Sequence, residues 1–200
     1  MREAKFPISD KEMLELLHKY PFLRYRNVWN GKQCFHGKSK NLAVNHYKEW
    51  DGTGWEELWK KYLIRLFKDY DSWSKKDQKS FCFTQIKEKY GTMRIYTSFT
   101  SDGDNELIAE MLSEYTCYQC GKRPIDANGN IYIWKSCGYI LPFCDECKAK
   151  YHDEDYEKAV LDHDYAITQY QKDGVYRVNY IEKDGWLERT EPKLIKENNK

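Results

Sequence analysis

The sequence lacks any apolar run that approaches the roughly 20 residues needed by a membrane-spanning helix. Its first residues, Met1 to Phe6, also lack the apolar segment of a secretory signal. Nothing in the sequence indicates an oxidising compartment, where disulfides form and persist. We therefore expect a cytoplasmic protein that keeps its thiols reduced and has no membrane partner.

Known catalytic signatures are missing as well. The sequence contains no Walker phosphate-binding loop, no Gly-x-Ser-x-Gly motif and no His-Glu-x-x-His motif. It also lacks the His-x-Glu and Pro-Cys-x-x-Cys signature of zinc deaminases. His36 and His46 could belong to a nuclease-like site, although a histidine in a polar loop usually has no chemical role. We assign no catalytic residue and predict that the protein is not an enzyme.

Net charge is almost absent, at +1, but it is unevenly distributed. Residues 1–100 contain 20 Lys and Arg against 12 Asp and Glu, a net +8. Residues 101–200 contain 13 against 20, a net −7. This asymmetry can direct an anionic partner to the first half, or it can reflect two regions that attract each other. The pI of about 7.5 argues against indiscriminate binding of polyanions.

Cysteine, in contrast, is abundant and regularly spaced. Four of the seven cysteines form two Cys-x-x-Cys pairs, Cys117 with Cys120 and Cys144 with Cys147, separated by 23 residues. Each such pair can sit on a tight turn that directs two sulfurs at one ion, and Gly121 suits the first turn. The spacing therefore predicts a structural zinc site with four thiolate ligands. Two disulfides are the alternative, which a reducing compartment disfavours.

The remaining cysteines are not expected to bind the ion. Four paired thiolates complete a tetrahedron, so a lone Cys137 between the pairs is better interpreted as a small buried apolar residue. The same interpretation applies to Cys34 and Cys82. His152 follows the second pair and could replace one sulfur, but four cysteines leave it no role as a ligand.

Apolar periodicity predicts an α+β fold, with an antiparallel sheet, packed helices and a C-terminal zinc-ribbon-like lobe. Ser9 to Glu12 has the pattern of a capping box, and the short helix that follows should end near Tyr20, before a proline. Eight aromatic and aliphatic residues at helical spacing predict a longer amphipathic helix over residues 55–70.

Strand-like segments follow this helix. Residues 81–87 and 93–99 predict an antiparallel hairpin, and residues 105–114 predict a helix that leads into the first cysteine pair. Between the cysteine pairs, residues 130–134 and 138–143 predict two paired strands.

The last fifty residues predict less regular structure. We expect an acidic helix over residues 153–171, a small hairpin formed by residues 175–181 and 186–187, and no regular structure over 191–200. Three regions follow from this pattern: 1–104, an α+β region with the amphipathic helix and the hairpin; 105–152, the zinc-bound lobe; and 153–200, a C-terminal extension.

Basic and aromatic residues are interleaved in two blocks of the first half. Guanidinium groups bind phosphate through paired hydrogen bonds, and aromatic rings stack on bases, so the blocks suggest a nucleic-acid or nucleotide ligand. In the alternative interpretation, Arg26 and Arg94 are partly buried and hold loop carbonyls or pair with Glu88. The candidate ligand-binding residues are Arg24, Arg26, Trp29, Lys87, Lys89 and Arg94.

Several blocks together resemble a family of small proteins from tailed phages and prophages. They are YPFLRYRNVWNG (20–31), Gly54-Trp55 at the start of a helix, QIKEKYGTMRIY (85–96), the first cysteine pair, and GYILPF (138–143) before the second pair. The resemblance covers most of residues 20–147 and excludes the last fifty. It implies a zinc-bound C-terminal lobe and, for a phage-encoded chain, a place in the host cytoplasm. It implies no activity.

We therefore expect a non-catalytic, zinc-stabilised binding protein that engages a nucleic acid or a nucleotide. The alternative is a protein–protein adaptor or an inhibitor of a host defence enzyme. Zinc ribbons with a projecting hairpin often serve as contact surfaces, and the acidic second half would suit a basic partner.

Overall fold

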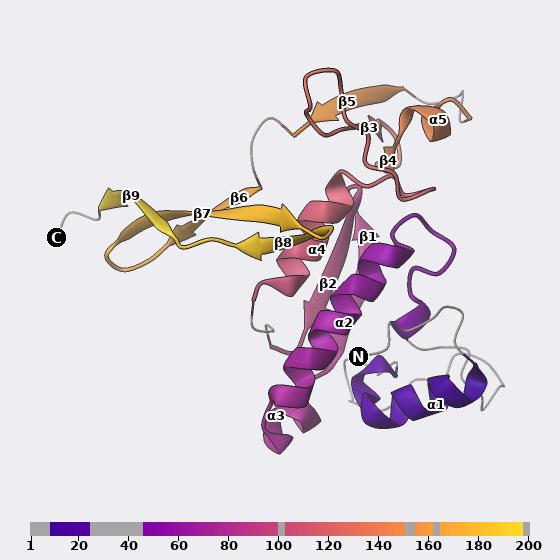
Figure 1. The fold of residues 1–200 in the computed structure, drawn as a ribbon, viewed down its shortest axis with the longest axis vertical. Coiled ribbons are helices and arrows are strands. Elements are labelled where there is room, and N and C mark those ends of the chain that lie inside the picture. The colour runs from indigo at the N-terminus through magenta and orange to yellow at the C-terminus, as the bar shows by residue number, and fades with distance from the viewer. Residues whose placement is uncertain (1–8, 25–45, 100–102, 151–154, 162–164, 198–200) are drawn as a thin grey trace.

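The computed structural model describes residues 9–24, 46–99, 103–150, 155–161 and 165–197. Within them the chain forms the predicted α+β fold, in which all strand pairs are antiparallel. Figure 1 shows a central body of helices and a hairpin, a lobe at one end, and a sheet that projects to the side.

Helix α2 (Glu56–Ser72) is the centre of the body and confirms the predicted amphipathic helix. It lies across a hairpin formed by β1 (Phe83–Lys89) and β2 (Thr92–Thr97), as predicted. Trp59 and Tyr62 are fully buried, with ring centroids 5.8 and 6.4 Å from that of Phe83 on β1. The short helix α3 (Lys75–Ser80), which follows α2, is not apparent from the apolar pattern.

The N-terminal helix α1 (Asp10–Lys19) starts and ends as its caps predict. Ser9 N donates to Glu12 Oε2 at 2.8 Å, and Ser9 Oγ accepts from Glu12 N at 3.3 Å, which completes the capping box. The chain then leaves the helix before the short turn η1 (Pro21–Leu23).

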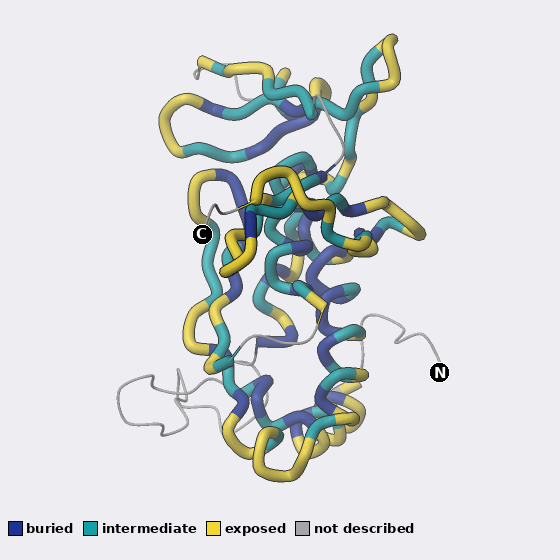
Figure 2. The backbone as a smooth tube through the Cα atoms, turned by 90° about the vertical axis from the view of Figure 1, so that its left-hand side faces the viewer, coloured by how far each residue is buried: buried dark blue, intermediate teal, exposed yellow. Residues whose placement is uncertain are grey.

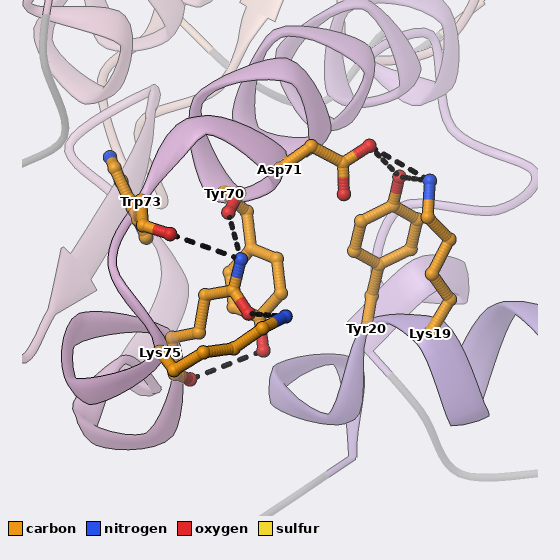
Figure 3. A network of polar contacts seen from close by, with 7 residues as sticks. Lys19, Tyr20, Tyr70, Asp71, Trp73 and Lys75 are labelled. Atoms are coloured by element: carbon orange, nitrogen blue, oxygen red, sulfur yellow. Dashed lines mark hydrogen bonds and ion pairs between the residues drawn. The ribbon is translucent and has the colours of Figure 1, made fainter.

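A polar network attaches this segment to the end of α2 (Figure 3). Lys19 Nζ and Tyr20 Oη both donate to Asp71 Oδ2, at 2.8 and 3.1 Å. The ring of Tyr20 also stacks on Phe67, with centroids 4.0 Å apart. These contacts hold the residues before Arg24 against the core.

Helix α4 (Asn105–Glu114) occupies the predicted residues and runs beside β2 (Figure 1). The backbone N–H of Met93 donates to Ser113 Oγ at 2.8 Å, so the helix satisfies a donor on the edge of the hairpin. Beyond α4 the chain enters the first cysteine pair.

A three-stranded sheet and a short helix surround the cysteines and form what we call the cysteine lobe. The sheet order is β4-β3-β5, with β3 (Tyr132–Ser136), β4 (Pro142–Phe143) and β5 (Tyr156–Val160), and helix α5 is Asp145–Lys148. The predicted strand pair between the cysteine pairs is confirmed by β3 and β4.

The C-terminal residues form a second sheet around one long strand, β7. Its elements are β6 (Ala166–Tyr170), β7 (Gly174–Lys183), β8 (Trp186–Arg189) and β9 (Lys193–Glu197). Strand β7 pairs with β6, β8 and β9, and the β7–β8 hairpin confirms the predicted terminal hairpin.

Two sequence predictions are wrong in this region. The expected acidic helix over 153–171 is replaced by β5 and β6. Strand β5 pairs with β3, which is distant in sequence, and β6 pairs with β7, the next strand along the chain. Residues 193–197, expected to lack regular structure, form β9 on an edge of β7. Pairing of this kind depends on neighbouring strands and not on local pattern.

The buried residues form two clusters. The larger cluster joins α1, α2, the hairpin and α4 to buried residues of the C-terminal sheet, such as Val178, Tyr180 and Trp186. The smaller lies in the cysteine lobe. Figure 2 shows buried positions concentrated along the inner sides of the central helices, with exposed positions at the turns. Among the described residues, no helix combines the length and apolar character required to cross a bilayer.

Candidate functional site

The four predicted ligands come together in the cysteine lobe. The sulfurs of Cys117, Cys120, Cys144 and Cys147 all lie within 4.8 Å of one another, and those of Cys120 and Cys144 are 3.6 Å apart. Three of the four residues are buried, and Cys120 is exposed. Four convergent sulfurs are a donor set that suits a soft or borderline metal ion, so this four-cysteine site could hold one.

The first pair sits on a tight turn. Gly121 N donates to Cys117 O at 2.9 Å, and Gly121 adopts a φ of 76°, which glycine accommodates without strain. Backbone N–H groups of Cys144, Cys120 and Gln119 donate to the sulfur of Cys117 and favour its thiolate. Burial is the larger effect and raises the pKa of the Cys117 thiol. A bound cation would offset that cost.

This turn packs directly against the segment that precedes α2. Gly54 N donates to Tyr118 O at 2.5 Å, and Trp55 Nε1 donates to Thr116 O at 2.9 Å. The rings of Trp55 and Tyr118 meet edge-on, with centroids 5.1 Å apart. A side chain on Gly54 would place its Cβ 2.1 Å from Cys117 O, so only glycine permits this approach.

The other cysteines lie outside the four-cysteine site. Cys137 was expected to be buried, and that expectation is wrong: it is exposed, because it falls in the turn between β3 and β4. Cys82 is partly buried at the start of the hairpin. Cys34 and His152 lie outside the described residues.

His46 has a structural environment. It is buried, its Nδ1 lies 3.2 Å from Glu49 Oε2, and its ring meets Phe83 edge-on. Its backbone carbonyl accepts from Trp59 Nε1 at 2.9 Å. These contacts account for the residue without a chemical role, and His36 lies outside the described residues.

A cavity of about 510 Å³ lies beside the cysteine turn and the start of α2. Its two basic side chains are both engaged. Lys61 Nζ donates to the carbonyl of Asp184 at 3.1 Å, and Arg123 contacts Glu182 at 2.5 Å. These bonds connect α2 and the cysteine lobe to the C-terminal sheet. The cavity therefore lies where these three parts of the structure meet.

The structure divides the predicted basic surface. Arg24 follows η1, where Phe22 packs on Phe83, the first residue of β1, and on Phe81 just before this strand. Lys89 lies at the other end of β1, six residues and about 20 Å further along the strand. The backbone of Arg24 therefore lies near the first residues of β1, whereas Lys87 and Lys89 lie near its last residues. Arg26 and Trp29 lie outside the described residues.

Arg94 fits the alternative interpretation of a partly buried, paired arginine. Its guanidinium forms an ion pair with Glu110 on α4, and not with Glu88. Both side chains are mostly covered, and burial raises the pKa of Glu110 while Arg94 opposes that shift. The pair connects β2 to α4.

Replacing Arg94 with methionine should therefore lower stability. We expect the free energy of unfolding to fall by about 1–3 kcal/mol near neutral pH, because Glu110 loses its partner. A raised pKa means that the folded protein holds this proton more tightly than the unfolded chain. Stability then falls as pH rises through the ordinary glutamate range, and it falls further without Arg94. Urea unfolding at acid and neutral pH measures both effects.

The matched control is Lys183→Met, which removes an exposed ion pair with Glu188 on the C-terminal sheet. Exposed pairs contribute little, so this change should stay within about 0.5 kcal/mol. Equal losses for the two variants would contradict a structural role for Arg94.

The two lysines of the hairpin, Lys87 and Lys89, lie beside the rings of exposed tyrosines. Lys87 and Lys89 alternate along β1 and share one face, as predicted from strand geometry. Lys87 Nζ lies 5.7 Å from the ring centroid of Tyr96, and Lys89 Nζ lies 5.1 Å from that of Tyr90. Tyr90 is 66% exposed and Tyr96 is 42% exposed.

Tyr90 has an unusual backbone. It has a φ of 55° and Gly91 has a φ of 75°, so the tip of the hairpin is a two-residue turn with both central residues in the left-handed region. Asparagine, aspartate and glycine suit the first of these positions, and an aromatic residue there is strained. The ring is mostly exposed and belongs to neither buried cluster, so it contributes little to the core.

A second exposed tyrosine approaches the tip from the cysteine lobe. Tyr139 is 68% exposed, and the neighbouring carboxylate of Glu88 raises the pKa of its hydroxyl. Between them lies a cleft of about 340 Å³, which we call the tyrosine cleft. It is lined by Glu88, Lys89, Tyr90, Gly138, Tyr139 and Ile140. Tyr139 is not among the residues predicted from sequence to bind a ligand, because only the docking of the lobe on the hairpin brings it to this place.

Comparison with protein-family models, with curated proteins and with solved structures found no match to this chain. The function must therefore be inferred from the site itself.

Proposed function

We propose that the protein is a non-catalytic binding protein whose ligand is a nucleic acid or a nucleotide, bound at the tip of the β1–β2 hairpin. The observation that carries this proposal is the strained, exposed Tyr90 with Lys89 beside its ring. Strained residues that the fold does not require are typical of functional sites. Exposed rings stack on bases, and neighbouring ammonium groups attract phosphates.

We further propose that the four-cysteine site binds one zinc ion as a structural metal. Four thiolates fill a tetrahedron and leave no position for water or substrate, so the ion would supply stability and no chemistry. Its role would be to hold the turn that carries Tyr139 against the hairpin. For a phage-encoded chain, as the resemblance to tailed-phage and prophage proteins implies, the protein would act in the cytoplasm of a host cell.

The decisive variant is Tyr90→Asn. Asparagine tolerates the left-handed conformation, so the variant should be as stable as the original protein or more stable by up to about 1 kcal/mol. Its affinity for a labelled single-stranded oligonucleotide should fall by about 5- to 100-fold, as expected for the loss of one stacked base. Fluorescence anisotropy and urea unfolding measure the two quantities.

Tyr170→Ala is the matched control, because Tyr170 is 83% exposed on β6 of the projecting sheet. This change should leave oligonucleotide binding unaltered. Two phosphate contacts, from Lys87 and Lys89, predict that the logarithm of the affinity falls with the logarithm of salt with a slope of about −1.4. Binding that is insensitive to salt, or unchanged in Tyr90→Asn, would refute the proposal.

A protein–protein adaptor is the second candidate, and the C-terminal sheet favours it. This sheet projects from the body and exposes four large apolar side chains: Tyr170, Ile181, Leu194 and Ile195. The ratio of absorbance at 260 and 280 nm, before and after a high-salt wash of the purified protein, distinguishes the candidates. Nucleic acid removed by salt supports the first, and a clean protein that captures one host protein supports the second.

A further inference from the structure

We propose that the tyrosine cleft binds a guanine base between Tyr90 and Tyr139, with Glu88 as the residue that recognises it. This proposal rests on the proposed function and specifies its ligand. A volume of about 340 Å³ is at the small end of ligand pockets, which suits one base and not a folded partner. Two exposed rings at its walls offer aromatic faces to a planar ligand.

The cleft is held in shape from both sides. The tip of the hairpin meets the loop of the cysteine lobe so closely that a Cβ on Gly91 would lie 3.2 Å from Ile140 Cγ2. Tyr139 and Ile140 line the cleft from the side of the lobe, beside Glu88 and Lys89 of the hairpin. The two tyrosines are therefore positioned before a ligand arrives, which reduces the entropy lost on binding.

Glu88 determines which base the cleft can recognise. Its carboxylate accepts from Gly91 N at 2.7 Å and lines the cleft beside Tyr139. A carboxylate offers about four acceptor positions, so at least about two remain for a ligand, and that ligand must donate to them. Guanine carries two adjacent donors, N1–H and the N2 amino group. On the same edge adenine, cytosine and uracil place acceptors beside a single donor group, and those acceptors repel a carboxylate.

The charge around the cleft favours a nucleotide over a basic peptide. Lys89 lines the cleft, and its ammonium lies 5.1 Å from the ring centroid of Tyr90. A lysine or arginine side chain entering between the tyrosines would meet this positive charge. A phosphate attached to a bound base would instead be attracted to Lys89, and Lys87 continues the basic row along the same face of β1.

Calorimetric titration with three nucleotides tests the proposal on the unmodified protein. GMP should bind more tightly than AMP by about 5- to 100-fold, the discrimination expected for a paired hydrogen bond to a base. Inosine monophosphate lacks the N2 amino group and should lie between them. Equal affinities for GMP and AMP, with oligonucleotide binding intact, would overturn the guanine assignment and leave the proposed function standing. Absence of binding to every nucleotide and oligonucleotide would overturn both.

Glu88→Gln tests the recognising residue. The amide oxygen can still accept from Gly91 N, so the turn should keep its geometry, while the amide nitrogen now faces the donors of guanine. We expect the preference for GMP over AMP to disappear, because the amide nitrogen offers a donor where guanine needs an acceptor. A preference that survives in Glu88→Gln would overturn the role of Glu88. Tyr139→Ala should weaken GMP binding about 5-fold or more, and the control Tyr170→Ala should not.

Discussion

Replacing Cys147 with serine is expected to remove the bound metal and unfold the cysteine lobe. The buried cluster of this lobe has five members, and three of them are cysteines: Cys117, Cys144 and Cys147, with Ile133 and Phe143. Apart from the cysteines, only two buried apolar side chains, with partly buried ones packed against them, hold three strands, so a bound metal would supply much of the stability of the lobe. Structural zinc contributes on the order of 10 kcal/mol or more to such a site, and the variant should forfeit most of it.

Metal content and hydrogen exchange measure this outcome. The original protein should contain one zinc ion per chain and the variant should contain none, and β3 and β5 should lose protection in the variant. Helix α2 should stay protected, because it belongs to the larger cluster. The same result should follow when a chelator removes the ion from the original protein.

Cys137→Ser is the matched control for this experiment. It also changes a cysteine of the lobe to serine, but Cys137 is exposed and lies outside the four-cysteine site. We expect full metal content and unchanged exchange. A metal-loaded, fully protected Cys147→Ser variant would show that the four thiolates are not the ligands.

Gly54→Ala should have the second-largest effect on stability. The added Cβ would lie 2.1 Å from Cys117 O and 2.2 Å from Gly121 N, distances that no real contact allows. Both neighbours are backbone atoms of the cysteine turn, so no side chain can rotate away. The turn or the start of α2 must move, and we expect the free energy of unfolding to fall by more than about 4 kcal/mol. Denaturant unfolding measures this loss.

Gly138→Ala provides the control for Gly54→Ala. A Cβ on Gly138 would have no atom within 4 Å, and its φ does not lie in the left-handed region. Stability should change by less than about 1 kcal/mol. If the two variants proved equally stable, the close packing of the cysteine turn on the segment before α2 would be incorrect.

The contact of Gly54 with the cysteine turn links the proposed metal site to the proposed ligand site. A bound metal would order the cysteine turn; that turn packs on Gly54 and Trp55, and the same lobe brings Tyr139 to the hairpin. A metal-free protein should therefore lose one wall of the tyrosine cleft while the hairpin and Tyr90 stay in place. The proposed metal site and one wall of the proposed ligand site thus lie in the same small lobe.

Local pattern predicted those parts of the fold that are determined over a few residues. The capping box at Ser9 places the start of α1, and apolar spacing places α2 and α4. The hairpin and the pair β3 and β4 also follow from alternation and turn residues. The four metal ligands follow from spacing, because a Cys-x-x-Cys pair has few geometries available to it.

Two strands whose partners are distant in sequence, β5 and β9, were not predicted. Residues 156–160 contain too little alternation to indicate a strand, and they become β5 because β3 offers a free edge. Residues 193–197 are exposed throughout, yet they pair with β7 as β9. Backbone hydrogen bonding across a sheet does not depend on side-chain pattern, so sequence carries little signal for it.

The sequence by itself determined the α+β class, the main helices, the hairpin and the identity of the four cysteines. Only the tertiary structure decided that Arg94 pairs with Glu110, and that the candidate surface lies at Lys89, Tyr90 and Tyr139. The physical reason is that helical spacing and Cys-x-x-Cys turns act over a few residues. A binding surface, in contrast, depends on how two separately folded segments dock, and here that depends on a glycine small enough to let them touch.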